Sequence, residues 1–317
     1  MKEPTESVTH MDSKTIAPRE IVINLMKEAV PERAKEIDDL WKKYSPEVVL
    51  VENVCRVTLN ATRDRIAFDT KTMQIFWLIG FSGWKAIECY SPHIIWSAKS
   101  NQTVTALIKD DANLDDVERA YKERRASAQD LIDAKDPSLI PWPPDIPEPS
   151  ESRDAFTDPQ DKSAFDITCL ALAFAFFHEF RHVMLDIDNV RHGDAREEEL
   201  DCDVWARNFM TAKIADYARD NGHDFNEILR KRSMGFALAA LILHEITPSW
   251  DHGGNQQYFS VATRLEAILD GTSLPDNDHF WNLAASLLLG IFRQKNIPIG
   301  ACPMNARELT RYFISHL

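Results

Sequence analysis

A run of nine apolar residues, Cys169–Phe177, leads without interruption into a short charged segment, His178–His182. Apolar side chains on every side of a helix are typical of a helix that is buried all round. Such a helix must lie in the core, and the rest of the chain must pack around it. Because buried polar groups are costly unless they find partners, the charged residues at its end must enter a lined cavity and not open solvent.

The charged segment reads HEFRH and places two histidines four residues apart. His178 and His182 therefore lie one turn apart on one face of the helix, where both imidazoles can reach a single metal ion. Glu179 follows the first histidine, a position from which its carboxylate can hold and deprotonate a water molecule at the metal. The alternative is a plain helix end whose histidines and Arg181 interact with the terminal backbone carbonyls. A third ligand at a suitable spacing decides between the two.

The next predicted helix supplies a candidate for that ligand. Its expected N-cap is Asp194, and Glu199, Asp203, Ala206 and Met210 share one of its faces. Two carboxylates one turn apart repel each other, and burying them is costly without cations. A zinc ion on Glu199 and an imidazole N–H on Asp203 would compensate both charges. The small side chain of Ala206 would let the two helices approach closely.

Other acidic residues nearby fit the spacing of a third ligand less well. Three residues of the same helix are expected on its solvent face: Glu197, Glu198 and Asp201. Asp188 could also serve as a third ligand, but that arrangement requires a glycine to turn the chain where Leu185 stands. We therefore expect Asp188 and His192 to be loop residues.

The remaining chain predicts an α+β protein that is mainly α. A helix is expected at 19–44 with a break at Pro31, then strands at 48–51, 54–59 and 65–69, the last after a polar turn that contains Asn60 and Asp64. Further helices are expected at 72–90, 114–132, 163–186, 195–217, 225–247, 256–270, 277–293 and 305–315. The predicted organisation is a flexible tail (1–18), an α/β part that supplies the sheet (19–136), a Pro-rich connecting loop (137–162) and a helical zinc-binding part (163–317).

The connecting loop contains five prolines between Pro143 and Pro159, besides Pro137 and Pro141. Such a run cannot continue a helix or lie inside a sheet. We expect a loop that Trp142 pins across the surface. The alternative is a ligand for a Pro-binding module.

Charge and composition exclude several classes of partner. The formal net charge of −14 argues against a nucleic-acid-binding surface, since phosphate recognition requires clustered Lys and Arg. The polar N-terminus has no apolar signal segment, and each apolar run is shorter than the roughly 20 residues that span a bilayer. Five widely spaced cysteines favour reduced thiols: Cys55, Cys89, Cys169, Cys202 and Cys302. We expect a soluble cytoplasmic protein without a membrane or nucleic-acid partner.

The HExxH motif followed by ExxxDxxA resembles the gluzincin metallopeptidases. More narrowly, the chain is similar to the Lit-type phage-exclusion peptidases in three features: the Pro-rich segment Trp142–Pro149, the apolar helix that ends in HEFRH, and the pattern that runs from Glu198 to Ala206. The resemblance implies a zincin-like catalytic core with a small N-terminal sheet packed on a helical bundle. It also implies cleavage of an intracellular protein, which for the Lit type is elongation factor Tu, in phage exclusion.

The sequence departs from that family pattern at one point. Related gluzincins often carry a His-Pro segment six residues before an arginine, where the histidine can stabilise the oxyanion. Here Tyr258 stands six residues before Arg264, and His252 lies further upstream. Both remain candidates for the oxyanion donor, and each also has a purely structural interpretation.

The sequence therefore predicts a zinc-dependent endopeptidase that hydrolyses an intracellular protein, in phage exclusion or a stress response. Zinc would be held by His178, His182 and Glu199, with Glu179 as the general base and Asp203 behind a ligand imidazole. The rival hypothesis is a non-catalytic regulatory or binding protein with an inert zinc site.

Overall fold

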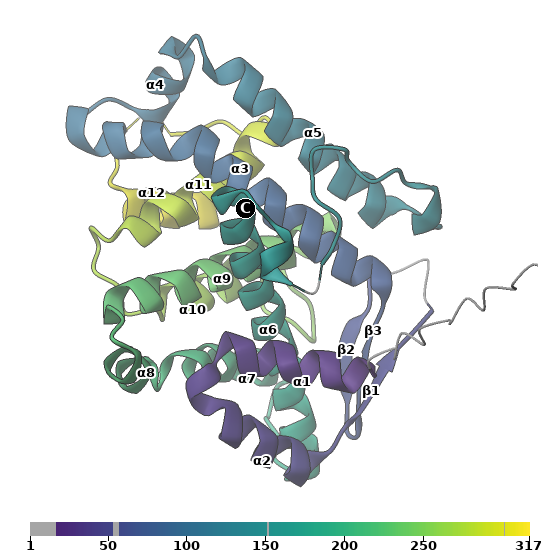
Figure 1. Cartoon of the computed structure of the whole chain (residues 1–317). Coiled ribbons are helices and arrows are strands. Elements are labelled where there is room, and N and C mark those ends of the chain that lie inside the picture. The colour runs from purple at the N-terminus through teal and green to yellow at the C-terminus, as the bar shows by residue number, and fades with distance from the viewer. Residues whose placement is uncertain (1–16, 53–56, 151, 301) are drawn as a thin grey trace, which may run out of the picture.

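The computed structural model describes residues 17–52, 57–150, 152–300 and 302–317. Helices dominate, and a three-stranded sheet accounts for the strands of the described residues. The sheet lies with α1 and α2 at one end of the molecule, whereas α4 and α5 lie at the other (Figure 1). This arrangement confirms the prediction of a mainly α, α+β protein.

The first helical segment breaks at the predicted proline. It comprises α1 (Pro18–Ala29), a single 3₁₀ turn (Pro31–Arg33) and α2 (Ala34–Tyr44). Pro31 lacks an amide hydrogen, so a continuous helix across it would lose a backbone hydrogen bond. Most of the predicted N-terminal tail, residues 1–16, lies outside the described residues.

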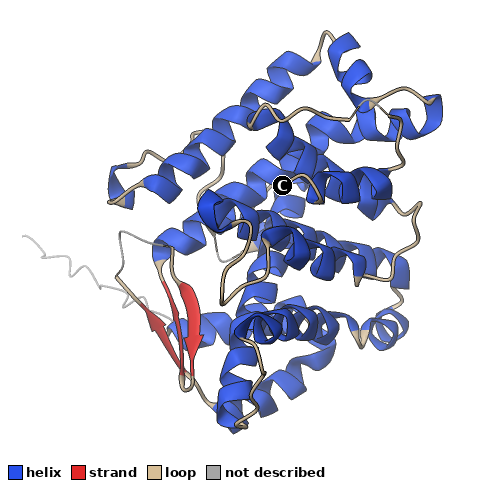
Figure 2. Cartoon of the chain, turned by 180° about the vertical axis from the view of Figure 1, so that it is seen from behind, coloured by secondary structure: helices blue, strands red, loops and turns tan. Residues whose placement is uncertain are grey.

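The sheet has the strand order β1-β3-β2. Strand β1 (Glu47–Leu50) pairs in parallel with β3 (Arg65–Phe68), and β2 (Leu59–Thr62) pairs antiparallel with β3. Figure 2 shows these strands in red at one side of the helical body. The predicted strand at 54–59 is only partly testable because residues 53–56 are outside the described ranges. The predicted turn is confirmed at Asp64, which lies between β2 and β3, but not at Asn60, which pairs with Ala67 inside the sheet.

Two long helices, α3 and α5, follow the sheet in the chain. Helix α3 (Thr70–Ser100) has 31 residues and runs on well past the predicted end at Tyr90, with Pro92 inside it. It packs against α5 (Leu114–Asp133), and the short α4 (Val104–Asp110), which the sequence analysis did not predict, joins them. Buried Tyr90 and Ile94 flank Pro92, so tertiary packing outweighs its local cost to the helix.

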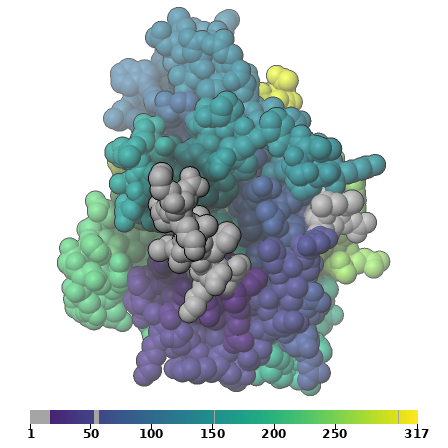
Figure 3. Space-filling model, turned by 45° about the vertical axis from the view of Figure 1, so that its right-hand side comes forward, coloured from purple at the N-terminus to yellow at the C-terminus, as the bar shows by residue number. Residues whose placement is uncertain are grey.

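Two tryptophan side chains hold the Pro-rich loop in place: Trp77 of α3 bonds to it from outside, and Trp142 of the loop bonds within it and packs against the core. The Trp77 indole N–H donates to the carbonyl of Pro147 and that of Trp142 donates to Ile146, each at 2.8 Å. Phe156 then enters an aromatic cluster beside Trp77. In Figure 3 the teal residues of α5 and this loop cover the upper part of the visible face, above the purple α1 and α2. These contacts agree with a structural loop.

In the C-terminal half, every regular element among the described residues is a helix. The helices are α6 (Pro159–Ile187), α7 (Ala195–Thr211), α8 (Ile214–Asn221), α9 (Phe225–Ile246), α10 (Val261–Asp270), α11 (His279–Gln294) and α12 (Ala306–Ile314). Two predictions need correction. The segment 195–217 is two helices, and the helix expected from 256 begins at Val261, after a loop that Gly254 turns with a φ of 86°.

Helix α6 is the centre of this arrangement and contacts α1, α3, α7 and α9. By length and composition it could cross a membrane, but 56% of its most apolar window is buried inside the protein. This burial is the pattern of a core helix. One buried core contains residues from Val22 to Ile314, so the segments before and after the connecting loop pack together. The predicted division of the chain into parts stays a prediction.

Four cysteines, Cys89, Cys169, Cys202 and Cys302, are free thiols. The fifth, Cys55, lies outside the described residues. Burial raises the pKa of Cys89 to about 12, which keeps this thiol protonated and unreactive.

Candidate metal centre

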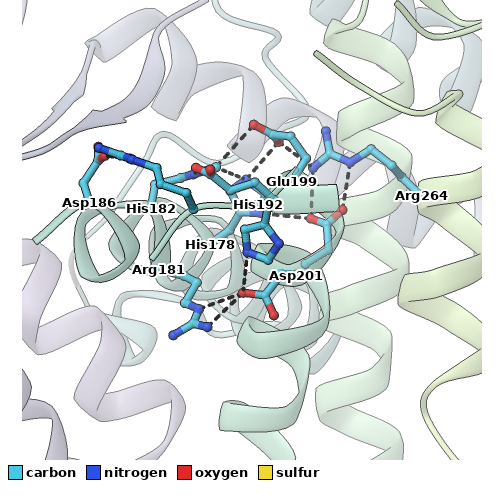
Figure 4. Close-up of polar contacts among 11 residues, drawn as sticks. His178, Arg181, His182, Asp186, His192, Glu199, Asp201 and Arg264 are labelled. Carbon is cyan, nitrogen blue, oxygen red and sulfur yellow. Dashed lines mark hydrogen bonds and ion pairs between the residues drawn. The ribbon is translucent and has the colours of Figure 1, made fainter. Parts of the chain in front are cut away.

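The last turns of α6 and the first turns of α7 bring three potential ligands together. Asp194 caps α7 by accepting a hydrogen bond from the Arg196 amide, as its sequence position predicted. His178 Nε2 and His182 Nε2 lie 3.2 Å apart. The Glu199 carboxylate contacts both, with Oε2 at 3.4 Å from His178 Nε2 and Oε1 at 3.3 Å from His182 Nε2. Figure 4 shows these side chains pointing toward one another.

The opposite ring nitrogens of both histidines face carboxylates of α7. His178 Nδ1 lies 2.9 Å from Asp203 Oδ1, and His182 Nδ1 lies 3.0 Å from Glu198 Oε1. The two helices run antiparallel, because the earlier histidine meets the later carboxylate. The sequence analysis placed Glu198 on the solvent face and so missed its contact with His182.

A buried arginine completes the centre. Arg264 of α10 donates from Nε to Asp203 Oδ2 at 2.7 Å and from Nη2 to Asp203 Oδ1 at 2.9 Å. Its Nη2 also lies 3.6 Å from Glu199 Oε2. Asp203 therefore bridges Arg264 and His178, and the two hydrogen bonds from Arg264 explain how a carboxylate whose side chain is 2% exposed can remain charged.

The three donor atoms suit a metal ion such as zinc. The cluster consists of two imidazole nitrogens and one carboxylate, and all its donor atoms lie within 4.8 Å of one another. Ligand bonds of about 2.0–2.1 Å in a tetrahedral site place neighbouring donor atoms about 3.3–3.4 Å apart. The two imidazole nitrogens, 3.2 Å apart, are close to that value, and Glu199 approaches each of them with a different carboxylate oxygen, at 3.4 Å from His178 and 3.3 Å from His182. His178, His182 and Glu199 could thus hold a metal ion between them.

The electrostatics of the site favour a cation. Burial raises the pKa of Glu179 to about 6, and the charges of the two histidines oppose this rise only in part. Burial also works against a charged His178, yet the neighbouring Asp203 and Glu199 raise the pKa of this imidazole to about 10. Carboxylates that stabilise positive charge on an imidazole would equally stabilise a metal ion at Nε2.

A cavity of about 560 Å³ opens onto these residues. Its polar lining includes the centre: His178, Glu179, His182, Glu198, Glu199 and Asp203. Apolar side chains also line it, among them Phe76, Phe174, Ile242, Leu243 and Ile268. Leu59, Asn60 and Ala61 of β2 form part of the rim, so the edge of the sheet borders the cavity. The predicted general base and ligands therefore share one partly apolar cleft.

The two candidate oxyanion donors occupy different places. Tyr258 lines the cavity, and the Arg264 guanidinium lies 5.9 Å from its ring centroid. His252 is not among the cavity-lining residues. Its Nε2 contacts the backbone carbonyls of Thr247 at 2.9 Å and His244 at 3.2 Å, where it closes the C-terminus of α9. Of the two, Tyr258 alone faces the cleft.

The residues set aside as loop positions lie away from the ligand cluster. Asp188 accepts hydrogen bonds from Tyr44 and Lys43 on the surface. His192 Nε2 lies 3.8 Å from Asp201, whose carboxylate is held by Arg181. Neither belongs to the group of residues that could bind a metal.

Comparison with known proteins assigns the family. A model of the peptidase U49 family, described as Peptidase U49, matches residues 66–284, which include most of β3, the whole centre and Arg264. The chain belongs to the peptidase U49 family. No curated protein sequence and no solved structure matches the chain. A peptide hydrolase is therefore the activity that the family supports.

Proposed function

We propose that this peptidase is a zinc-dependent endopeptidase of gluzincin type. The observation that carries the proposal is the convergence of His178, His182 and Glu199 at ligand spacing, with Glu179 in the same cavity. The family match covers these residues, and their donor set is one that catalytic zinc sites use. Three protein ligands would leave a coordination position open for reaction.

A bound zinc ion would supply Lewis acidity to the scissile carbonyl and to the attacking water. The chain's own residues do the rest. Glu179 takes a proton from the attacking water on its carboxylate and passes it to the leaving amine nitrogen. In the metal-free site burial raises the pKa of this carboxyl to about 6, so the carboxylate is a better proton acceptor than an exposed one.

Tyr258 is the proposed donor to the developing oxyanion. Its side chain lines the cleft, and burial together with the nearby Glu199 raises its pKa, so the phenol keeps its proton. A protonated phenol can donate a hydrogen bond to an oxyanion. Arg264 holds Asp203 and thereby keeps His178 oriented.

The sheet offers a place for an extended substrate. Strand β2 pairs with β3 on one side, and among the described strands it has no partner on the other. Residues Leu59–Ala61 line the cavity at that edge. An extended polypeptide could add to the edge as a further strand and present its backbone to Glu179. We propose a cytoplasmic protein as substrate, with elongation factor Tu in phage exclusion as the candidate that the Lit-type resemblance suggests, and no nucleic-acid or membrane partner.

Metal removal and reconstitution test the proposal. Purified protein is stripped with a chelator, and cleavage of elongation factor Tu and of an unfolded protein such as casein is followed before and after zinc is restored. We expect activity to disappear and return, together with about one zinc per chain. The variants His178→Ala, His182→Ala and Glu199→Ala should lose the zinc, whereas Glu197→Ala is a control on the exposed face of α7. Full zinc in Glu199→Ala would contradict the assignment of the third ligand.

The rival hypothesis, a regulatory protein with an inert zinc site, predicts the same metal content. It differs in predicting no cleavage under any of these conditions. Zinc binding without cleavage of either protein would therefore favour the rival.

A further inference from the structure

Glu198 has no step in the mechanism above, although it touches one of the proposed ligands. Its Oε1 lies 3.0 Å from His182 Nδ1, the ring nitrogen opposite the one that faces His178 and Glu199. We infer that Glu198 is a positioning residue, which holds the His182 ring so that Nε2 is directed at the metal position. The inference rests on the proposed metal site and deepens it.

Hydrogen-bond chemistry fixes the tautomer that this contact requires. A neutral imidazole has one N–H donor and one acceptor nitrogen, whereas an ionised carboxylate only accepts. With Glu198 against Nδ1, the proton of His182 must reside on Nδ1 and the free electron pair on Nε2. That is the form in which Nε2 can bind a metal, and the contact also prevents the ring from turning over.

The two histidines are anchored differently. Asp203, behind His178, has a side chain that is 2% exposed and is itself held by Arg264. Glu198, behind His182, is 28% exposed, and among the described residues no arginine or lysine forms an ion pair with it. His178 is therefore held by Asp203, which Arg264 holds in turn. The carboxylate behind His182, that of Glu198, has no such arginine behind it in the part of the chain that the structure describes.

The neighbouring residue provides a matched control. Glu197 precedes Glu198 on the same turn of α7, carries the same charge and is exposed. Substituting Glu197 changes the net charge and the local helix as much as substituting Glu198 does. Only the Glu198 substitution removes the contact with His182.

The test measures zinc affinity by chelator competition in the full-length chain for wild type, Glu198→Ala, Glu198→Gln and Glu197→Ala. We expect Glu198→Ala to weaken zinc binding ~10–100-fold, the usual effect of losing a partner behind a ligand histidine. Glu198→Gln should lose less, because its amide oxygen can accept the same N–H. Glu197→Ala should bind zinc as wild type does. Nitrogen-15 NMR of the His182 ring should report the Nδ1–H tautomer in wild type and in Glu198→Gln.

Equal zinc affinity in Glu198→Ala and wild type would overturn the inference, and so would an equal loss in Glu197→Ala, which would indicate a general charge effect. Should Glu198→Ala not fold, a His182 ring with its proton on Nε2 in the metal-free wild-type protein would overturn it. A different outcome would refute the proposed function. Wild-type protein that binds zinc but cleaves nothing refutes the peptidase proposal and leaves the role of Glu198 intact.

Discussion

Replacing Asp203 by Asn should both weaken metal binding and destabilise the metal-free protein. The side chain is buried, and it accepts two hydrogen bonds from Arg264 and contacts His178 Nδ1 at 2.9 Å. Asn keeps the shape but loses the charge and one acceptor, so buried Arg264 loses its bidentate partner. Breaking a buried ion pair costs about 3–5 kcal/mol, and the acceptor that Asn retains reduces this to about 2–3 kcal/mol.

Urea unfolding of chelator-treated protein measures that loss, and chelator competition measures the zinc affinity, which should fall ~10–100-fold. Asp201→Asn is the matched control. Asp201 lies on the same helix and pairs with Arg181, but its side chain is 33% exposed. A partly exposed pair of this kind contributes only about 0–1 kcal/mol. Equal unfolding free energies for the two variants, or wild-type zinc affinity in Asp203→Asn, would refute the bridging role of Asp203.

Three further predictions concern separate parts of the molecule. Tyr258→Phe should retain zinc while kcat falls ~10²–10³-fold, the scale for one oxyanion donor, and an unchanged kcat would exclude Tyr258. Burial opposes charge on Glu118, but its hydrogen bonds with Arg293, Lys122 and Tyr90 lower its pKa from 4.5 to about 2. Its contribution to stability, at most about 3 kcal/mol, is thus present above pH 4.5 and is lost as the pH falls toward 2. Unfolding free energies of Glu118→Gln and wild type should therefore differ most above pH 4.5 and converge in acid, whereas a constant difference would contradict this linkage. Trp142→Phe removes the indole hydrogen bond to the Ile146 carbonyl within the connecting loop and should lower the unfolding free energy by about 1 kcal/mol, which urea titration would detect.

Local patterns were sufficient to predict much of the fold. The distribution of apolar residues predicted the bounds of α6 and α9 to within a few residues. The break at Pro31 and the strand at Arg65 were likewise predictable from the local sequence. The extension of α3 through Pro92 was not predictable, because proline favours a helix end locally and only packing against other helices outweighs it.

The candidate site was also predictable only in part. Spacing within one helix brings His178 and His182 together, and spacing within the next places Glu199 and Asp203 on one face. The contact of Glu198 with His182 depends on how α7 is rotated against α6, and the sequence of α7 alone does not determine that rotation. The pairing of Arg264 with Asp203 likewise depends on the packing of α10 against α7.

The most direct test of the central claim compares wild type with Glu179→Gln in the native host. New protein N-termini are identified by proteomics, and the zinc content of both purified proteins is measured. Residue 179 is not one of the proposed ligands, so the amide variant should bind zinc and unfold as wild type does. Because an amide cannot take the proton from the attacking water, the wild-type cleavage products should be absent, a loss of at least ~10²–10⁴ in rate. The same new N-termini at comparable abundance in Glu179→Gln would contradict the proposed hydrolysis and favour an inert metal site.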